Sequence, residues 1–325
     1  MEYDMLSSIS PTVRNGKDNL LLKCFREIST IDLQQNNCTQ RLHLYALNNN
    51  RMQFDYAGLI ALLKNNIANY VYSRRTYKEY VDNDTICAAV IDAQQKLISI
   101  NENALDVKNY GSGGELGELL LYVFFESFLN APKLLSKVEI KTNDNDFVKG
   151  FDGVYFRIKH YDTYSAYQVV YGEAKIKSDI KDAIKEAFQS LKAGISKAST
   201  DWGLIDGKFF DEILVDAKEA ELLKATLIPK YRDASSNIEN ENAYGIFIGY
   251  SFSPTEFKGC TPKENINRKV QQDIENVKTQ IVTLIESMPE VDSDYYIFFL
   301  PFNDAIKDKH SIMQQIAGVT VNESK

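Results

Sequence analysis

Apolar residues recur at helical spacing in two stretches of the first hundred residues. These stretches are YAGLIALLKNNIANYVYS, from Tyr56, and TICAAVIDAQQKLI, from Thr85. Apolar positions three and four apart form one stripe along a helix. The tracts LQQNNCTQ and LNNNRM that precede them are polar and have no clear period. We therefore expect residues 1–105 to form a largely helical N-terminal region that could dock a partner.

The pattern changes after the turn-rich stretch NENALDVKNYGSGG. GELGELLLYVFFESFLN predicts a helix that ends at Asn130 and Pro132, and SDIKDAIKEAFQSLKAGISKA predicts a second helix with Ser178 as its N-cap. KVEIKT, FDGVYFRI and SAYQVVYGEAKI predict strands between them, and YGIFIGYSF and YYIFFLPF predict two more. This alternation predicts an α/β fold for residues 106–325, with a mixed sheet between helices.

A long helix is expected between the last two strands. It opens with TPKE, a capping box with Thr261 at the N-cap and Glu264 at the third helical position. An apolar stripe follows at alternating spacings of four and three, from Val270 to Met288. Such a stripe is either covered by the protein's own sheet or free to bind a partner helix, and we favour the first interpretation.

The hairpin formed by FDGVYFRI and SAYQVVYGEAKI brings charged residues together. Its turn, KHYDTYS, is centred between Asp162 and Thr163, so residues whose numbers sum to 325 lie opposite each other unless a β-bulge shifts the register. Asp152 then faces Glu173, and Lys175 shares the face of Glu173 because side chains alternate. Opposed carboxylates repel unless a cation lies between them, which favours a metal site. The simpler alternative is a Glu173–Lys175 salt bridge at a strand end.

Two carboxylates that hold a metal beside an ammonium group are suited to phosphodiester hydrolysis. Mg²⁺ takes one or two protein carboxylates and keeps waters, and Mn²⁺ prefers the same oxygen ligands. The ion lowers the pKa of a bound water. Lys175 would hold the attacking water and offset the developing negative charge. The preceding helix offers a further carboxylate at Glu118, with Glu115 and Tyr122 one turn away on either side.

The composition indicates the cellular compartment and the kind of metal site to expect. The start MEYDMLSSIS lacks the basic and apolar segments of a leader, and the longest apolar run, LLLYVFF, is too short to cross a membrane. Four cysteines form no CxxC pair, which is typical of a reducing cytoplasm, and the three scattered histidines argue against a zinc site. We therefore expect a cytoplasmic protein in which any metal is held by oxygen atoms.

The net charge of −8 bears on nucleic-acid binding. A protein that grips DNA alone usually has a basic surface, so DNA must meet a local basic patch here or be delivered by a partner. Lys177, Lys181 and Lys185, on the helix after the hairpin, could follow a DNA backbone. Acidic residues alternate with them, and an ordinary solvated helix face has the same pattern.

The order of these motifs resembles the PD-(D/E)XK nuclease superfamily. The resemblance is carried by a helix-borne Glu, then GFDGV, then VVYGEAK, then an amphipathic helix, and it implies a core of helix, mixed sheet and second helix. It also implies that Asp152, Glu173 and Glu118 hold Mg²⁺ or Mn²⁺ and that Lys175 is the catalytic lysine. Glu115 is the alternative candidate for the metal-binding role assigned to Glu118.

Gln189 is similar to the Gln of the QxxxY element of some branches of that superfamily. Ala193 stands where the Tyr would be, so the element is incomplete here.

More narrowly, GSGGELGELLLYVFFE, KGFDGVYF and YGEAKIKSDIKDAI are similar to the HamA family, the nuclease-like subunits of Hachiman anti-phage defence systems. The resemblance spans residues 105–325 and is most specific across 112–190. It implies a metal-dependent DNA endonuclease that is bound and restrained by a helicase subunit, HamB. The alternative is a catalytically idle nuclease fold that serves as an interaction subunit of the helicase complex. The complete set of Asp152, Glu173 and Lys175 favours the active enzyme.

Overall fold

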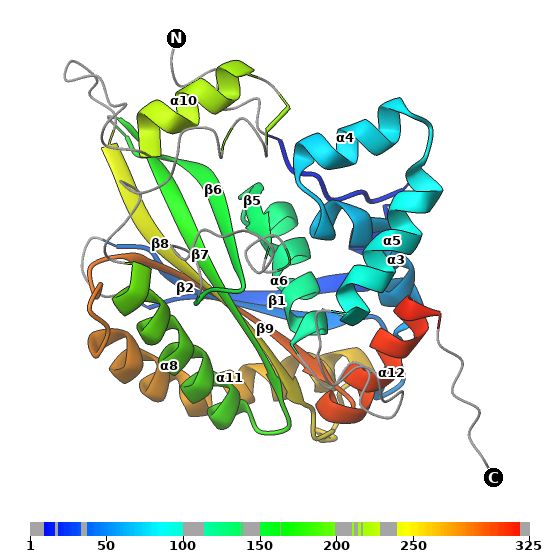
Figure 1. Ribbon diagram of the computed structural model, residues 1–325. Coiled ribbons are helices and arrows are strands. Elements are labelled where there is room, and N and C mark those ends of the chain that lie inside the picture. The colour runs from blue at the N-terminus through cyan, green and yellow to red at the C-terminus, as the bar shows by residue number, and fades with distance from the viewer. Residues whose placement is uncertain are drawn as a thin grey trace.

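A seven-stranded mixed sheet with helices on both faces organises the molecule (Figure 1). The computed structural model describes residues 10–16, 19–33, 38–99, 114–136, 138, 150–162, 164–198, 210, 214–215, 217–227 and 239–318. The strand order is β1-β2-β9-β8-β7-β6-β5, and the central strands β2, β9, β8 and β7 run parallel to their neighbours in that group. The sheet strands are β1 (Phe25–Asp32), β2 (Gln40–Leu47), β5 (Lys133–Ser136), β6 (Gly153–His160), β7 (Ser165–Lys177), β8 (Glu239–Ser251) and β9 (Asp294–Phe302).

Two helices cover one face of the sheet and α6 packs on the other. Phe188 of α8 stacks on Tyr295 of β9, and α11 packs beside α8. On the opposite face, Phe124 of α6 lies against Phe247 and Phe298. The helices are α2 (Leu20–Cys24), α3 (Ala57–Val71), α4 (Arg74–Asp82), α5 (Ile86–Ser99), α6 (Glu115–Phe128), α8 (Ile180–Ala198), α10 (Ala217–Leu227), α11 (Pro262–Glu286) and α12 (Ala305–Ala317).

Helix α6 approaches the sheet so closely that small residues are required beneath it. A Cβ atom at Gly245 of β8 would overlap the ring of Phe125, and one at Gly117 of α6 would lie 3.2 Å from the Cβ of Ala174 in β7. Cores packed to this density do not admit an extra methyl group without displacement. The close contact between Gly117 and Ala174 fixes the first turn of α6 beside β7.

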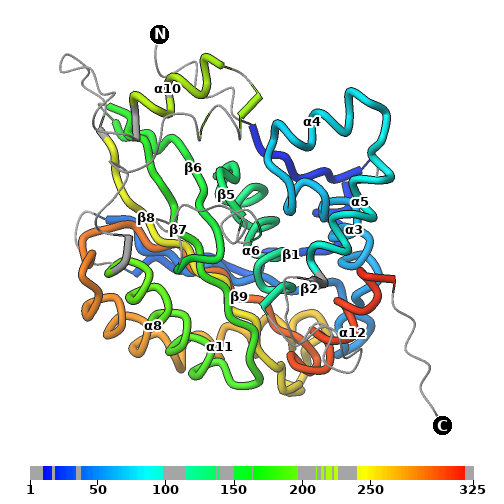
Figure 2. The backbone as a smooth tube through the Cα atoms, viewed as in Figure 1, coloured from blue at the N-terminus to red at the C-terminus, as the bar shows by residue number. Residues whose placement is uncertain are grey.

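The N-terminal region is not the largely helical unit that its two apolar stretches predicted. Helices α3 and α5 form where expected, but Phe25–Asp32 and Gln40–Leu47 form β1 and β2, and a short hairpin, β3 (Asn49–Asn50) with β4 (Gln53–Phe54), follows. Figure 2 shows the blue strands β1 and β2 beside β9, with which β2 pairs in parallel. Leu42 and Leu44 are fully buried, so β2 is a core strand. The boundary at residue 105 stays a prediction because residues 100–113 lie outside the described residues.

The middle hairpin has the register that its turn predicts. Every pair in the β6–β7 ladder, from Gly153 with Gly172 to His160 with Ser165, sums to 325. The helix after it begins one residue later than expected, because Asp179 Oδ1, and not Ser178, accepts the N–H groups of Lys181 and Asp182. The expected strand KVEIKT lies outside the described residues except for Val138, and β5 forms just before it.

The long helix α11 keeps its apolar stripe inside the protein. Its capping box is present, with Thr261 accepting from the N–H of Glu264. Val270, Ile274 and Ile281 are fully buried, and the helix packs on α8 and β2. The interpretation that the protein's own core covers this stripe is therefore confirmed. Across the described ranges, every helix is too short or too polar to span a bilayer.

Candidate active site at the open end of the β6–β7 hairpin

Asp152 and Glu173 lie close together where β6 begins, because the side chain of Asp152 binds the residue after Glu173. The backbone N–H of Asp152 donates to the carbonyl oxygen of Gly172 at 2.8 Å, although Gly172 is already the ladder partner of Gly153. Asp152 and Gly153 therefore form a β-bulge opposite Gly172, and the expected alignment of Asp152 with Glu173 is shifted by one residue. Both side chains are buried, with residue exposures of 4% and 2%. Since Ala174 points toward α6, the side chains of Glu173 and Lys175 emerge on the other face of β7.

Each of these two carboxylates has a partner within the protein. Asp152 Oδ2 accepts the backbone N–H of Ala174 at 2.9 Å, and Glu173 Oε1 accepts Lys175 Nζ at 2.5 Å. The Lys175 side chain is 24% exposed, whereas that of Glu173 is 3% exposed. The ammonium group therefore bridges a buried carboxylate and the solvent.

The first turn of α6 brings two more acidic residues to the same strand. Gly117 touches Ala174, and the neighbouring Glu118 is buried and accepts the hydroxyl of Tyr70 at 2.9 Å. Glu115, one turn earlier, is also buried. Glu118 lies on the α6 face of the sheet, opposite the face that carries Glu173, and the charges of Glu118 and Asp152 both act on Tyr70.

Helix α12 adds a cationic residue that the sequence pattern did not indicate. Burial lowers the pKa of Lys309, the charge of Glu115 opposes that shift, and the charge of Lys177 reinforces it. Lys309 therefore lies within electrostatic reach of the start of α6 and the end of β7. No periodicity or motif links it to residues more than 130 positions earlier, so only the tertiary structure reveals it.

The remaining candidates lie in different surroundings. The hydroxyl of Tyr122 is 2.8 Å from the Thr12 hydroxyl, in the segment before α2. Gln189 is exposed on α8, as are Lys181 and Lys185. Lys177 forms a half-exposed salt bridge with Glu186 at 2.8 Å. Three lysines therefore lie on or beside the solvent-exposed face of α8. This placement is compatible both with contact to a DNA backbone and with an ordinary solvated helix face.

The donor set fits a magnesium-type ion with few protein ligands. Within the described part of the chain, no three His, Cys, Asp or Glu side chains are grouped as metal ligands. Mg²⁺ requires only one or two carboxylates and completes its shell with water and substrate oxygens. Asp152 and Glu173 supply such a pair, with Glu118 nearby. Zinc, which takes three or four protein ligands, does not fit these residues.

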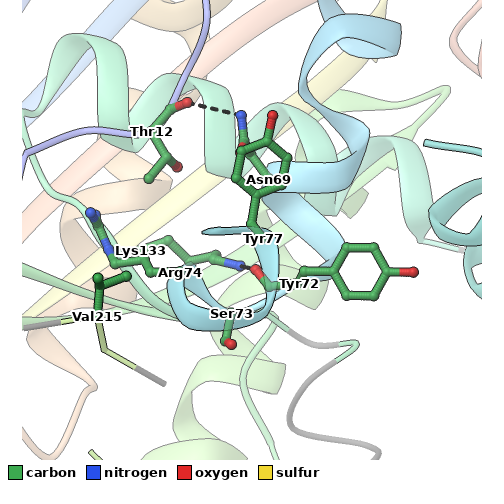
Figure 3. Close-up of a pocket in the computed structure, with 8 residues that line it drawn as sticks. All are labelled: Thr12, Asn69, Tyr72, Ser73, Arg74, Tyr77, Lys133 and Val215. Atoms are coloured by element: carbon green, nitrogen blue, oxygen red, sulfur yellow. Dashed lines mark hydrogen bonds between the residues drawn. The ribbon is translucent and has the colours of Figure 1, made fainter. Parts of the chain in front are cut away.

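A second polar cluster, which no sequence pattern indicates, lies between α3, α4, α6 and β5. Buried Glu126 of α6 accepts the N–H groups of Thr12, Val13 and Lys133. Beside it is a cavity of about 200 Å³ (Figure 3). The cavity is lined by Thr12, Asn69, Tyr72, Ser73, Arg74, Tyr77, Lys133 and Val215.

Fold and site together define a three-layer α/β protein with paired acidic residues and a lysine at a hairpin end. A family model with the description HamA matches residues 23–316, and the chain belongs to the HamA family. No curated protein matches the chain. Membership of this family implies a role in Hachiman anti-phage defence.

Proposed function

We propose that the protein is a metal-dependent DNA endonuclease of the PD-(D/E)XK type, acting in anti-phage defence with a helicase partner. The observation that carries this proposal is the closeness of buried Asp152 to buried Glu173, since Asp152 accepts the N–H of the next residue, Ala174, together with the Lys175 ammonium group 2.5 Å from Glu173. The succession of α6, the β5–β7 strands and α8 supports the nuclease-type core. Neighbouring buried carboxylates are costly unless they are compensated, which a cation would do.

In this proposal Asp152 and Glu173 hold Mg²⁺ or Mn²⁺, and Glu118 completes the set. When bound, such an ion would lower the pKa of a coordinated water and offset negative charge on the phosphate oxygens. Lys175 already donates to Glu173 and is partly exposed, so its remaining N–H groups can bind a phosphate oxygen or the attacking water. Lys309, near Glu115, adds positive charge where DNA would enter.

A specific observation favours the alternative of an idle nuclease fold that serves as an interaction subunit. Asp152 is engaged by the N–H of Ala174 and Glu173 by Lys175, so both carboxylates are accounted for without a metal. An interaction subunit would keep these contacts for stability alone. The two functions differ in one measurable respect, which is phosphodiester cleavage.

We also propose that a helicase supplies the DNA. A net charge of −8 disfavours tight DNA binding by the isolated chain, and a tethered partner would raise the local substrate concentration. Since the apolar stripe of α11 is buried, that stripe is not the docking surface, and we assign docking to the N-terminal region. A stable complex with the helicase of the same system is expected, and its absence would contradict this part of the proposal.

A cleavage assay tests the enzyme. The protein alone and with its helicase is incubated with plasmid DNA in Mg²⁺, Mn²⁺, Ca²⁺ or chelator, and in parallel with RNA. We expect cleavage of DNA in Mg²⁺ or Mn²⁺, inhibition by Ca²⁺, and none for Glu173→Gln. Glu275→Gln, which changes an exposed carboxylate on α11, is the matched control and should cleave normally. Full activity of a folded Glu173→Gln protein would refute the site.

A further inference from the structure

Tyr70 connects the N-terminal region to the hairpin end. Its hydroxyl, on α3, donates to Glu118 Oε2 on α6 at 2.9 Å. Tyr70 is fully buried and Glu118 is 7% exposed. A hydrogen bond between a neutral donor and a carboxylate is among the stronger kinds in a buried setting, and it fixes the orientation of the carboxylate.

The hydroxyl of Tyr70 acts only as a donor. Burial raises the pKa of Tyr70 well above its usual range, and the negative charge of Glu118 adds to that shift, as, to a smaller extent, does the charge of Asp152. The phenol therefore stays protonated at any physiological pH. Because both carboxylates act on it, Tyr70 lies between the first turn of α6 and the start of β6.

The backbone of Tyr70 is held as firmly as its side chain. The buried Lys133 ammonium group donates to the carbonyl oxygens of Tyr70 and Tyr72 at 2.9 and 2.8 Å, at the C-terminal end of α3 where helix carbonyls lack intrahelical partners. The backbone N–H of Lys133 in turn donates to Glu126 at 2.8 Å. Lys133 is one of the residues drawn in Figure 3. The ring of Tyr70 packs against Tyr122, with centroids 5.8 Å apart.

We infer that Tyr70 is a positioning residue that orients the Glu118 carboxylate toward the metal and substrate at the hairpin end. The inference rests on the proposed function, since it assigns to Glu118 a role in that site. It makes the N-terminal region a structural part of the active site as well as a docking surface. A partner that shifts the end of α3 would thereby change the orientation of Glu118.

Direct Mn²⁺ binding tests the inference apart from activity. Outer-shell hydrogen bonds to metal ligands are typically worth about 10- to 100-fold in affinity or activity. We expect Tyr70→Phe to weaken Mn²⁺ binding, measured by calorimetry or by the spin-resonance signal of free Mn²⁺, by at least about 10-fold. Cleavage should fall at low Mn²⁺ and recover in part at high Mn²⁺.

Tyr296→Phe is the matched control. It removes another buried tyrosine hydroxyl that donates to a carboxylate, from Tyr296 to Asp294 at 3.0 Å, far along the sheet from Glu118. The control should keep its Mn²⁺ affinity within about twofold while losing comparable stability. Equal weakening of Mn²⁺ binding in both variants would show a general structural effect and overturn the inference.

A double substitution separates this inference from the proposed function. If Tyr70 acts through Glu118, adding Tyr70→Phe to Glu118→Gln should leave the Mn²⁺ affinity of Glu118→Gln unchanged. Normal Mn²⁺ binding by wild type with unchanged affinity in Tyr70→Phe overturns the inference alone. Wild-type protein that binds no Mn²⁺ overturns the inference and the proposed metal site together.

Discussion

The carboxylate of Asp152 accepts a hydrogen bond from the backbone N–H of Ala174 at 2.9 Å, just beyond the last pair of the β6–β7 ladder. At this point the side chain replaces the backbone acceptor that a continuing strand would have offered. Asp152 therefore has a structural role as well as the proposed metal-binding one. Substitutions at this position must separate the two roles.

Asparagine and alanine at position 152 should behave differently in stability but alike in cleavage. Asp152→Asn keeps an oxygen that accepts from Ala174, so its free energy of unfolding should fall by less than about 1 kcal/mol, whereas Asp152→Ala leaves that N–H unpaired and should cost about 1–3 kcal/mol. Both variants lose the negative charge and should lose cleavage. Urea unfolding and the plasmid assay measure the two effects. Cleavage by Asp152→Asn at the wild-type rate would contradict the metal-ligand role.

Replacing one partner of the Glu173–Lys175 pair should lower the free energy of unfolding more than replacing both partners. Lys175→Met leaves a buried carboxylate without its ammonium partner, and we expect a loss of about 1–3 kcal/mol in the free energy of unfolding. Adding Glu173→Gln should recover part of that loss, because no buried charge then remains. Cleavage should be absent in both variants.

Lys177→Met provides the comparison for this pair. The Lys177–Glu186 bridge is 40% and 43% exposed, so its loss should cost less than about 1 kcal/mol. Equal destabilisation by Lys175→Met and Lys177→Met would mean that burial of Glu173 contributes nothing to the pair.

Glu126 should hold the segment at residues 10–14 against the body of the protein. Its carboxylate accepts the backbone N–H groups of Thr12 and Val13, and Asn66 pairs with both the N–H and the carbonyl oxygen of Arg14. Glu126→Gln removes the charge and places an NH₂ group among donors. We expect a loss of about 2–4 kcal/mol and faster proteolytic cleavage near Thr12.

Limited proteolysis with N-terminal sequencing locates that cleavage. Glu79→Gln, which alters an exposed glutamate on α4, should change neither stability nor the rate of cleavage. An unchanged proteolysis rate in Glu126→Gln would show that other contacts suffice to hold the segment.

The elements with strong local signals were predictable from the sequence. The β6–β7 register follows from one short turn, and the capping box at Thr261 marks the start of α11. Each signal depends on residues that are neighbours in the sequence, so distant contacts have little influence on the structure that it predicts. The predicted alignment of Asp152 with Glu173 was wrong by one residue, because the bulge at Asp152 and Gly153 lies beyond what the turn alone determines.

The rest of the structure depends on contacts that a linear pattern does not encode. Strand β2 follows a polar tract and is stabilised by parallel pairing with β9, more than 240 residues later. Tyr70 and Lys309 reach the hairpin end only because α3 and α12 pack beside α6. Neither has a spacing relationship to Glu118 that would have suggested a shared site.

His43 should make the protein less stable in mild acid. It lies on β2, stacked on Phe298 at 4.6 Å, and its Nε2 has no hydrogen-bond partner among the described residues. Burial lowers its pKa from 6.5 to about 4, and the charge of Arg41 adds to this shift. Because the folded-state pKa is depressed, the unfolded chain binds the proton first as the pH falls. The stabilisation is complete above pH 6.5 and is lost progressively toward pH 4.

Unfolding at pH 7 and at pH 4.5 in denaturant measures this effect. Wild type should lose up to about 3 kcal/mol over this range through His43, since one pKa unit corresponds to about 1.4 kcal/mol. His43→Gln should show a flatter pH dependence, with lower stability at pH 7. His160→Gln alters an exposed histidine that contacts Ser165 at 2.8 Å and should retain the wild-type slope.

Asp294 does not interfere with this measurement. Burial raises its pKa, but its hydrogen bonds to Lys159 and Gln168 outweigh burial, so the pKa is lowered overall. Its contribution to stability is therefore lost only at more acidic pH, and the chosen range reports His43. A wild-type slope in His43→Gln would assign the acid sensitivity to other groups.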